Sequence, residues 1–290
     1  MEINLINFIF FILMKKKDSK ESTIKYFIIQ SSGSILFLFS ITINIKYYNQ
    51  EFYIWAMLPP IALMLKSGMA PLHSWIPEIV KNFNYLSLLM ILTMQKIIPI
   101  FILFSSWYNL LTWIAIFNII KGSLMGLNQN SLIKLLIFSS INNNGWLIFS
   151  MLESIFMFMI FFTIYFVLNM MIIFYMKFFK IKWIIQMKSK TKFQKMYLFF
   201  SFLSLAGLPP FLGFTPKWMI LFKMLNFNSL ICFLLILFSL LTLYFYIKNL
   251  TPLLLNSKSN QNWYSFLLKF NMEMLFLVNF TGIFMWLFLT

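Results

Sequence analysis

Four lysines, Lys66, Lys96, Lys134 and Lys217, lie within or at the edge of stretches that are otherwise long and apolar. If these stretches cross a membrane, each ammonium group is costly to hold there, so such residues usually face an interior water path and move charge. Burial favours the neutral amine, which lets a lysine load and release a proton near neutral pH. The predicted chemistry is therefore proton transfer.

The four positions differ in how strongly they indicate this chemistry. Lys96 lies about 18 Å along a helix from Asn84, too deep for its ammonium to reach the membrane surface. Lys66 and Lys217 each follow a pair of prolines, where freed carbonyl groups and water can stabilise the charge. Lys134 stands just inside its segment, and a side chain that reaches the surface explains it equally well.

Glu2 is the acidic residue expected at membrane depth, because the first apolar segment ends at a basic loop only 13 residues later. A carboxylate and a lysine in contact titrate as a coupled unit, and Glu2 is a candidate for such a pair. This segment spans about 20 Å of a hydrocarbon layer of about 30 Å. We expect that residues precede Met1 in the functional chain or that a partner covers this end.

Composition places the chain among membrane proteins. It has 290 residues, 61% of them hydrophobic and 10% charged, whereas soluble domains have about 25% charged residues. Apolar runs of roughly 18 residues or more recur, and backbone polar groups in lipid must be satisfied within each segment. The runs are too uniformly apolar for barrel strands. The predicted fold is all-α and polytopic, with about 10 transmembrane helices in a single domain.

The predicted segments come from the apolar runs, and the lysines between them predict the orientation. The segments run at roughly 2–14, 22–44, 53–72, 84–104, 110–126, 131–150, 154–176, 196–226, 228–247 and 264–289. Lysines gather on one side, which we expect to be the cytoplasmic or matrix side: Lys15, Lys16, Lys17, Lys20, Lys25, Lys81, Lys177, Lys180, Lys182, Lys188, Lys190, Lys192, Lys195, Lys248, Lys258 and Lys269. The opposite side has little beyond Lys46 and Lys223.

Two segments share an unusual pattern of prolines. Leu58-Pro59-Pro60 precedes Lys66, and Gly207-Leu208-Pro209-Pro210 precedes Lys217. Proline removes a backbone donor, so both helices are predicted to break there. The two segments cross in opposite directions, and paired interrupted helices of this kind are typical of inverted-topology transporters. We predict a first half at about 1–104, a second half at about 105–250 and a final helix at 264–289; two unrelated kinks are the alternative.

Few residues are of the types that hold metals or redox cofactors. The chain has one cysteine and one histidine, whereas clusters of several Cys or His are needed for iron–sulfur or zinc sites. Cys232 is interpreted as a core residue, and His73 as a loop histidine bonded to the backbone. The net charge of +16 comes from lysines in short loops, which favours membrane topology over nucleic-acid binding. No metal or cofactor site is predicted in this chain.

The chain resembles the antiporter-like membrane subunits of respiratory complex I, the NADH dehydrogenase subunit 2 family, and its Phe, Ile and Lys bias resembles the insect members. The resemblance is colinear over nearly the whole chain and is carried by Met1–Leu5, Ile24–Phe27, Lys66–Glu78, Gln95–Pro99, Gly126–Gln129, Ser139–Ile141, Gly145–Trp146 and Gly207–Trp218.

The resemblance implies a proton-translocating subunit of NADH:ubiquinone oxidoreductase in the inner mitochondrial membrane, with its lysine-rich loops toward the matrix. It also implies that NADH, FMN, iron–sulfur clusters and ubiquinone are handled by other subunits of that enzyme. The implied partners are the other membrane-arm and accessory subunits and the lipid bilayer, without nucleic acid. Redox energy would reach this chain as changed charge or hydration at its lysines.

The family's site residues carry over by motif. The resemblance implies that Glu2 pairs with Lys66, that Lys96 continues the path and that Lys217 leads to the exit side; Lys134 matches a further lysine of the central polar axis. Two features depart from the family. A helix that usually precedes the one carrying the glutamate is absent, and Asn143 stands where members often have a titratable histidine.

Two other functions remain open from the sequence. A stand-alone cation/proton antiporter would share the lysines and the inverted halves. A non-transporting scaffold of the same complex would hold its lysines in fixed pairs.

The polar run Ser139–Asn144 can hold water or simply bind neighbouring helices.

Overall fold

Helices form nearly all of the chain that the computed structural model describes, which comprises residues 2–13, 20–46, 57–189, 192–225, 228–255 and 279. Among these residues there is no β-strand, and the only strand-like pairing is an isolated bridge between Ser131 and Trp183. The all-helical fold predicted from the sequence is confirmed. The chain divides into two compact units, Met1–Asn118 and Ile119–Thr290, and the border falls within one helix.

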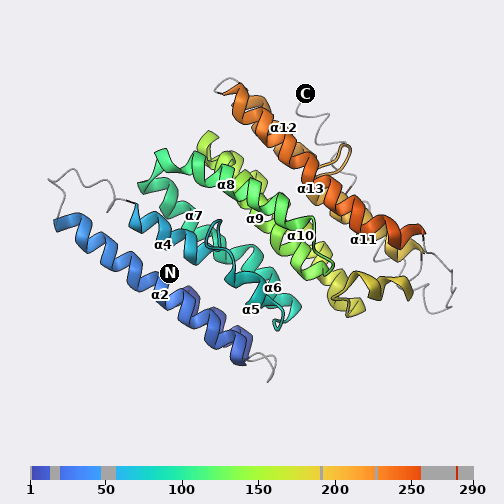
Figure 1. Ribbon diagram of the computed structural model, residues 1–290, viewed down its shortest axis with the longest axis horizontal. Coiled ribbons are helices and arrows are strands. Elements are labelled where there is room, and N and C mark those ends of the chain that lie inside the picture. Colours follow the sequence, from blue (N-terminus) through green and yellow to red (C-terminus); the bar gives the residue numbers. More distant parts are fainter. Residues whose placement is uncertain are drawn as a thin grey trace. The chain divides into compact units, whose positions relative to one another are not determined.

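The first unit consists of one long helix and several shorter helices that pack against it and against one another. Its helices are α1 (Glu2–Leu13), α2 (Lys20–Lys46), α4 (Leu58–Ser67), α5 (Trp75–Val80), α6 (Tyr85–Leu92), α7 (Met94–Ser106) and the first part of α8 (Tyr108–Gly126). The long helix α2 lies alongside α4, and α4 in turn contacts α7 (Figure 1). The shorter α1 packs against α2 and α6. These contacts bring the start of the chain close to α4.

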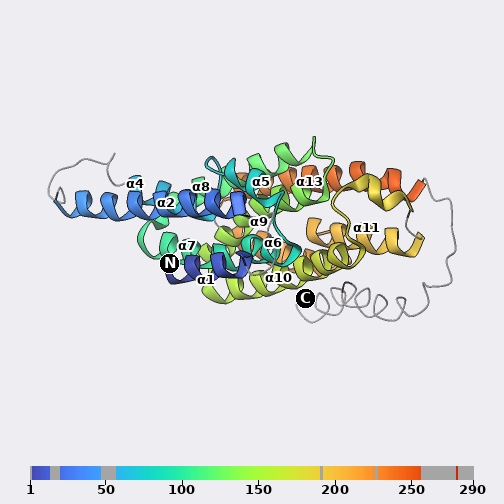
Figure 2. The ribbon, with the colours of Figure 1, turned by 90° about the horizontal axis from the view of Figure 1, so that it is seen from below.

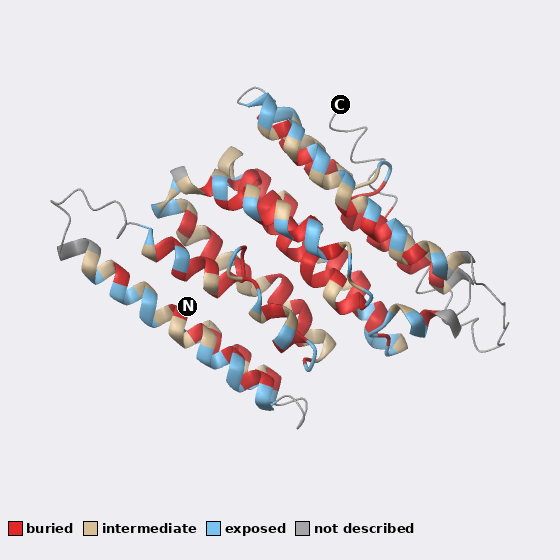
Figure 3. Cartoon of the chain, in the orientation of Figure 1, coloured by how far each residue is buried: buried red, intermediate tan, exposed pale blue. Residues whose placement is uncertain are grey.

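The second unit is centred on helix α9. After the rest of α8 come α9 (Leu132–Glu153), α10 (Ile155–Phe179), a 3-10 turn (Ile184–Ser189), α11 (Lys192–Ala206), α12 (Phe214–Met224) and α13 (Ser229–Leu255). Helix α9 runs beside α10 and also contacts α12, and α11 packs against α10 and α13 (Figure 2). Almost every residue of α9 is buried, whereas one face of α13 is exposed (Figure 3). The polar run Ser139–Asn144 therefore lies in the interior.

In the part of the chain that the structure describes, five helices are long and apolar enough to cross a membrane: Lys20–Ile43, Tyr85–Ser106, Leu132–Glu153, Ile155–Phe179 and Ser229–Pro252. The predicted segments from 2–14 to 228–247 overlap helices of the structure, although Thr93 separates α6 from α7 within one of them. The last predicted segment, 264–289, lies outside the described residues apart from Asn279.

The helix break predicted at Pro59 and Pro60 depends on the residues immediately before Met57, which lie outside the described residues. Both prolines stand in the first turn of α4, where a helix has no intrahelical partner for the missing N–H group. The chain leaves this helix after Ser67, at Gly68 with φ +66°. Lys66 therefore lies in the last turn of α4, just before Gly68.

The interruptions in the two units share local features. In the first, Gly68 has φ +66° and the Ala70–Pro71 peptide is cis; in the second, Gly207 has φ +85° and the Pro209–Pro210 peptide is cis. Glycine is favoured at both positions because residues with a Cβ atom rarely adopt positive φ. Each interruption exposes the carbonyl groups of a helix end to side chains nearby.

The second interruption depends on a close approach of two backbone segments. A Cβ atom at Gly213 would fall on the carbonyl oxygen of Ser204, and no side-chain movement relieves a contact with backbone. We predict that Gly213→Ala prevents the close approach of this backbone to Ser204. The yield of folded variant chain after detergent extraction, measured by size-exclusion chromatography, should fall severely.

Gly126→Ala is the matched control for this prediction. Its Cβ atom would lie 2.8 Å from Cε1 of Phe245, a side-chain atom that can shift. An overpacking cost of about 1–3 kcal/mol is expected there, with the yield of folded chain largely kept. Equal yields of the two variants would contradict the prediction.

Candidate functional site

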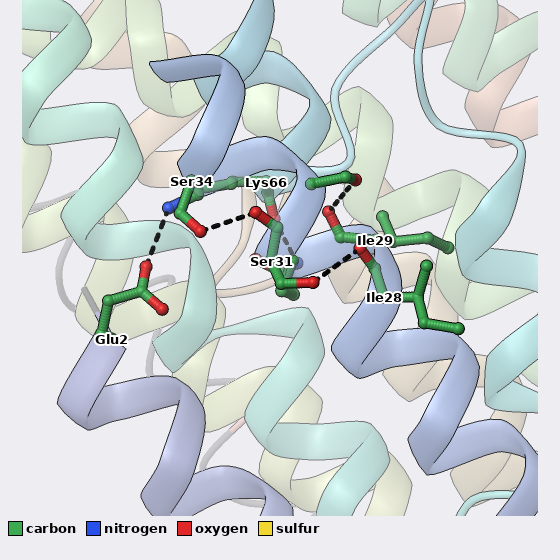
Figure 4. A network of polar contacts seen from close by, with 8 residues as sticks. Glu2, Ile28, Ile29, Ser31, Ser34 and Lys66 are labelled. Carbon is green, nitrogen blue, oxygen red and sulfur yellow. Dashed lines mark hydrogen bonds and ion pairs between the residues drawn. The ribbon is translucent and has the colours of Figure 1, made fainter. Parts of the chain in front are cut away.

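An ion pair between Glu2 and Lys66 joins helices α1 and α4 in the first unit. Nζ of Lys66 lies 3.3 Å from Oε1 of Glu2, and Figure 4 shows the two side chains meeting end to end. The side chain of Lys66 is 5% exposed and that of Glu2 is 57% exposed. Glu2 is in the first turn of α1 and Lys66 in the last turn of α4, and the helix dipole favours each charge at its position. The pair thus links a buried amine to an accessible carboxylate.

Helix α2 supplies the surface across which the Lys66 side chain runs. A Cβ atom at Gly33 would lie 2.9 Å from Cγ and 3.4 Å from Cε of Lys66, so glycine makes room for the stem of the lysine. The side chain of Gln30, one turn earlier, donates a hydrogen bond of 2.9 Å to the Lys66 carbonyl oxygen. Serine hydroxyls of α2 around this point bond to carbonyls of their own helix (Figure 4). Gly33 and Gln30 together fix the position of Lys66.

A small polar pocket adjoins the ion pair. Its lining includes the polar side chains of Glu2, Asn4, Gln30, Lys66 and Gln95, and its volume is about 20 Å³. An internal water needs about 10–15 Å³ measured in this way, together with two to four polar partners. The pocket meets both requirements. Asn4 Nδ2 donates to Oε1 of Gln95 at 3.3 Å, which ties α1 to α7 at this point.

Lys96 follows Gln95 on α7 and is 2% exposed. Pro99, three residues later, cannot donate the backbone hydrogen bond that would normally end on the Gln95 carbonyl. Helices α4 and α7, which carry Lys66 and Lys96, are in contact. The structure therefore buries Lys96 in the interior of the first unit, next to a freed carbonyl group.

Lys217 in the second unit is held by the end of a neighbouring helix. Its Nζ donates hydrogen bonds to the carbonyl oxygens of Ala206 at 2.8 Å and Leu205 at 3.2 Å, the last two residues of α11. It also lies 5.5 Å from the ring centroid of Trp146 on α9. A helix C-terminus and an aromatic face both attract a cation. Lys217 is 6% exposed, so these neutral groups stabilise its charge away from bulk water.

Lys134 is placed differently from the other lysines. It is partly exposed in the first turn of α9. Trp146, which contacts Lys217, follows 12 residues later, or about 18 Å along the helix. The structure therefore does not bring Lys134 and Lys217 together, and a surface-reaching side chain still explains Lys134.

Sequence reasoning missed several residues of these sites. Gln30 and Gln95 were detectable as amides inside apolar helices, whereas nothing in the sequence connects Trp146 with Lys217. Lys195, predicted to lie among the loop lysines, is 1% exposed on α11. The interpretation of His73 is confirmed, because its Nδ1 lies 3.1 Å from the Pro71 carbonyl oxygen. Among the residues that the structure describes, no three His, Cys, Asp or Glu side chains group as metal ligands would.

Residues 1–243 match the family model described as NADH:quinone oxidoreductase/Mrp antiporter, transmembrane. The chain belongs to this family. This match confirms the family resemblance expected from the sequence. Two relatives in the same family support it. A protein of Anopheles gambiae named NADH-ubiquinone oxidoreductase chain 2 is 35% identical over 274 residues, which cover 91% of this chain and 80% of the relative. The protein of the same name from Locusta migratoria is 36% identical, covering 86% and 75%.

Chains of solved structures have the same fold. A chain of respiratory complex I from Thermus thermophilus with bound aureothin matches 96% of this chain and 70% of its own length, with a TM-score of 0.75 and 15% identity. A chain of the Mrp complex from Dietzia matches 80% and 50%, with a TM-score of 0.62 and 16% identity. At these identities the likeness establishes the antiporter-like fold.

The exposure of Glu2 gives a prediction about stability. An ion pair with one solvated partner contributes about 1 kcal/mol or less. We predict that Glu2→Gln changes the thermal stability of the assembled chain by no more than this amount, because water replaces the lost contact. A thermal-shift measurement on the purified complex checks it, with Glu21→Gln, in the exposed pair with Lys25, as the control. A much larger loss of thermal stability for Glu2→Gln alone would contradict the solvent exposure of the Glu2 carboxylate.

Proposed function

We propose that this chain is the proton-translocating membrane subunit of an NADH:ubiquinone oxidoreductase, respiratory complex I, in the inner mitochondrial membrane. The observation that carries the proposal is the burial of Lys66, Lys96 and Lys217 in a chain of this family. The names of its relatives support the identity of the complex. Electron transfer from NADH to ubiquinone takes place on other subunits, which hold the NADH, FMN and iron–sulfur sites.

The site residues that we assign to proton transfer are Glu2, Lys66, Lys96, Lys134 and Lys217. Glu2 and Lys66 form the accessible end of the path in the first unit, since their contact joins an open carboxylate to a buried amine. A change in charge or hydration on either partner acts directly on the other across this contact. Lys96 continues the path within that unit.

Lys217 is suited to release a proton toward the exit side. Its ammonium is stabilised by two carbonyl groups and an aromatic ring, and by no carboxylate among the contacts described above. Neutral dipoles stabilise a cation without fixing it as an ion pair would, so the charge can leave without stranding a buried anion. Asn143, which stands where family members often have histidine, takes no protonation role.

The chain acts as a single transmembrane domain of about ten helices with two inverted halves, about 1–104 and 105–250, followed by a last helix at 264–289. The interrupted helices are those that carry Lys66 and Lys217. The positive φ that Gly68 and Gly207 share supports this division. The lysine-rich loops face the matrix, following the charge rule for membrane proteins, and the neighbouring membrane-arm and accessory subunits cover the apolar faces together with lipid.

A stand-alone cation/proton antiporter is the second candidate, and the likeness to a chain of the Mrp complex favours it. An antiporter would run on an ion gradient without redox subunits. Affinity purification of the chain from mitochondria distinguishes the two. Recovery with the flavin- and iron–sulfur-containing subunits supports complex I, and recovery without them supports the antiporter.

The proposal predicts that Lys217→Met abolishes proton translocation through this subunit, because a thioether carries no proton. The measurement is the number of protons moved per NADH oxidised by the assembled complex in vesicles. Lys121→Met, at an exposed lysine of α8, is the matched control and should leave this ratio unchanged. A non-transporting scaffold would keep the proton yield in both variants, and that result with intact assembly would refute the proposal.

A further inference from the structure

Helix α10 ends in a stretch of chain that is rich in positive charge and that the proposed proton path does not use. Residues 177–195 contain seven lysines and no aspartate or glutamate. Three of these lysines, Lys177, Lys180 and Lys182, are exposed. The first is in the last turn of α10, the second caps that helix, and the third lies in the segment that follows. These three lysines form a basic patch at the end of α10.

The charge of the basic patch is not neutralised within the part of the chain that the structure describes. There, none of its three lysines makes an ion pair or a side-chain hydrogen bond. Lys25 is also exposed but differs, because its Nζ lies 2.6 Å from Oε1 of Glu21. The basic patch is therefore suited to bind an anion from outside the chain.

The backbone of Lys180 has a conformation that favours glycine. Its φ is +53°, and among the described residues that carry a side chain it alone has a positive φ. Glycine is the usual residue at this position after a helix, because it has no Cβ atom. An unfavourable backbone conformation at a residue of this kind is a reason to look for a function of its side chain. The ammonium of Lys180 is such a candidate.

Contacts with the start of α9 fix the segment that carries the basic patch. The backbone N–H of Leu132, the first residue of α9, donates to the carbonyl oxygen of Lys182 at 3.1 Å. Oε1 of Gln186 accepts hydrogen bonds from the backbone N–H groups of Lys182 at 2.6 Å and Trp183 at 3.1 Å. Ile181, between the lysines, is buried. Because this backbone is already ordered, a ligand of the patch has less ordering cost to overcome.

Exposed apolar side chains adjoin the basic patch. Phe178, Trp183 and Ile185 are each more than half exposed. Helix α10 has 25 residues and is about 37 Å long, whereas the hydrocarbon layer of a membrane is about 30 Å thick, so the end of α10 reaches the headgroup level. Tryptophan is enriched at that level, and lysines beside apolar residues are typical of surfaces that bind anionic lipid. This combination favours a lipid over an acidic protein segment.

We propose that Lys177, Lys180 and Lys182 bind the phosphate group of an anionic phospholipid, while Trp183 and Ile185 contact its glycerol and acyl-chain region. The inference goes beyond proton translocation and does not depend on it. Stabilisation of the C-terminal dipole of α10 is a simpler role for Lys177 and Lys180. It does not account for Lys182, which lies beyond the helix, or for the exposed apolar neighbours.

The lipid site is tested first on the unmodified complex in phosphatidylcholine nanodiscs. Photoactivatable phosphatidylglycerol should label residues 177–187 more strongly than photoactivatable phosphatidylcholine, as measured by mass spectrometry of the peptides. Equal labelling by the two lipids would overturn the proposal. Competition by inorganic phosphate would overturn the assignment to a lipid. Absence of lipid labelling, together with carbodiimide cross-links from these lysines to another subunit, would instead show an acidic protein partner.

The role of the lysine side chains is tested with Lys180→Gly, which removes the charge and suits the positive φ. One lysine near an anionic membrane surface contributes about fivefold in affinity. Labelling by limiting phosphatidylglycerol should therefore fall by about this factor, while the yield of folded chain is kept or raised. Lys180→Arg should keep the labelling, because it keeps the charge. Lys25→Gln, at a lysine already paired with Glu21, is the matched control and should label normally.

The outcomes of the variants decide between a lipid site and a purely structural role. Unchanged labelling in Lys180→Gly refutes the proposal, and so does an equal fall in Lys25→Gln. If Lys180→Gly does not fold, Lys182→Gln replaces it. Its side chain is exposed, and the same fall in labelling is expected. Normal labelling in a folded Lys182→Gln chain would then refute the proposal.

Discussion

In both units of this molecule, the structure has to stabilise the positive charge of a lysine away from bulk water. Moving an ammonium group out of water costs several kcal/mol even after the protein relaxes around it. Beside Lys66 lie the exposed carboxylate of Glu2 and a small polar pocket, whereas Lys217 uses the carbonyl groups at the end of α11 and the face of Trp146. The two arrangements give one charge a titratable partner and leave the other with neutral dipoles.

The interrupted helices follow from the same requirement. A continuous helix satisfies its own carbonyl groups and has none to offer a cation, whereas a helix end exposes up to four. Gly207 ends α11 and lets Lys217 of α12 reach back to it, and a Cβ atom at Gly207 would lie 2.9 Å from Cδ of the lysine. In the first unit, the lack of a side chain at Gly33 leaves space on α2 along which the Lys66 side chain extends. Glycine at these positions thus serves the placement of charge as well as backbone conformation.

Certain predictions failed or stayed untested because sequence patterns do not report three-dimensional neighbours. Pro59 and Pro60 predict a helix break, but the residues immediately before Met57 on which that break depends lie outside the described part of the chain, and both prolines also suit the first turn of α4, where they stand. Lys195 lies in a lysine-rich stretch that predicts a loop, but packing buries it on α11. Lys134 remains ambiguous, since its position at a helix start and its partial exposure are compatible with either interpretation.

The sequence by itself determined the class of protein, the helical segments and the lysines that lie inside them. Those properties depend on local hydrophobicity and helix length, which neighbouring residues along the chain define. Only the tertiary structure decided that Gln30 bonds the carbonyl of Lys66, and that Trp146 lies over the ammonium of Lys217. Such contacts arise from the packing of separate helices, whose relative rotation and depth no local pattern specifies.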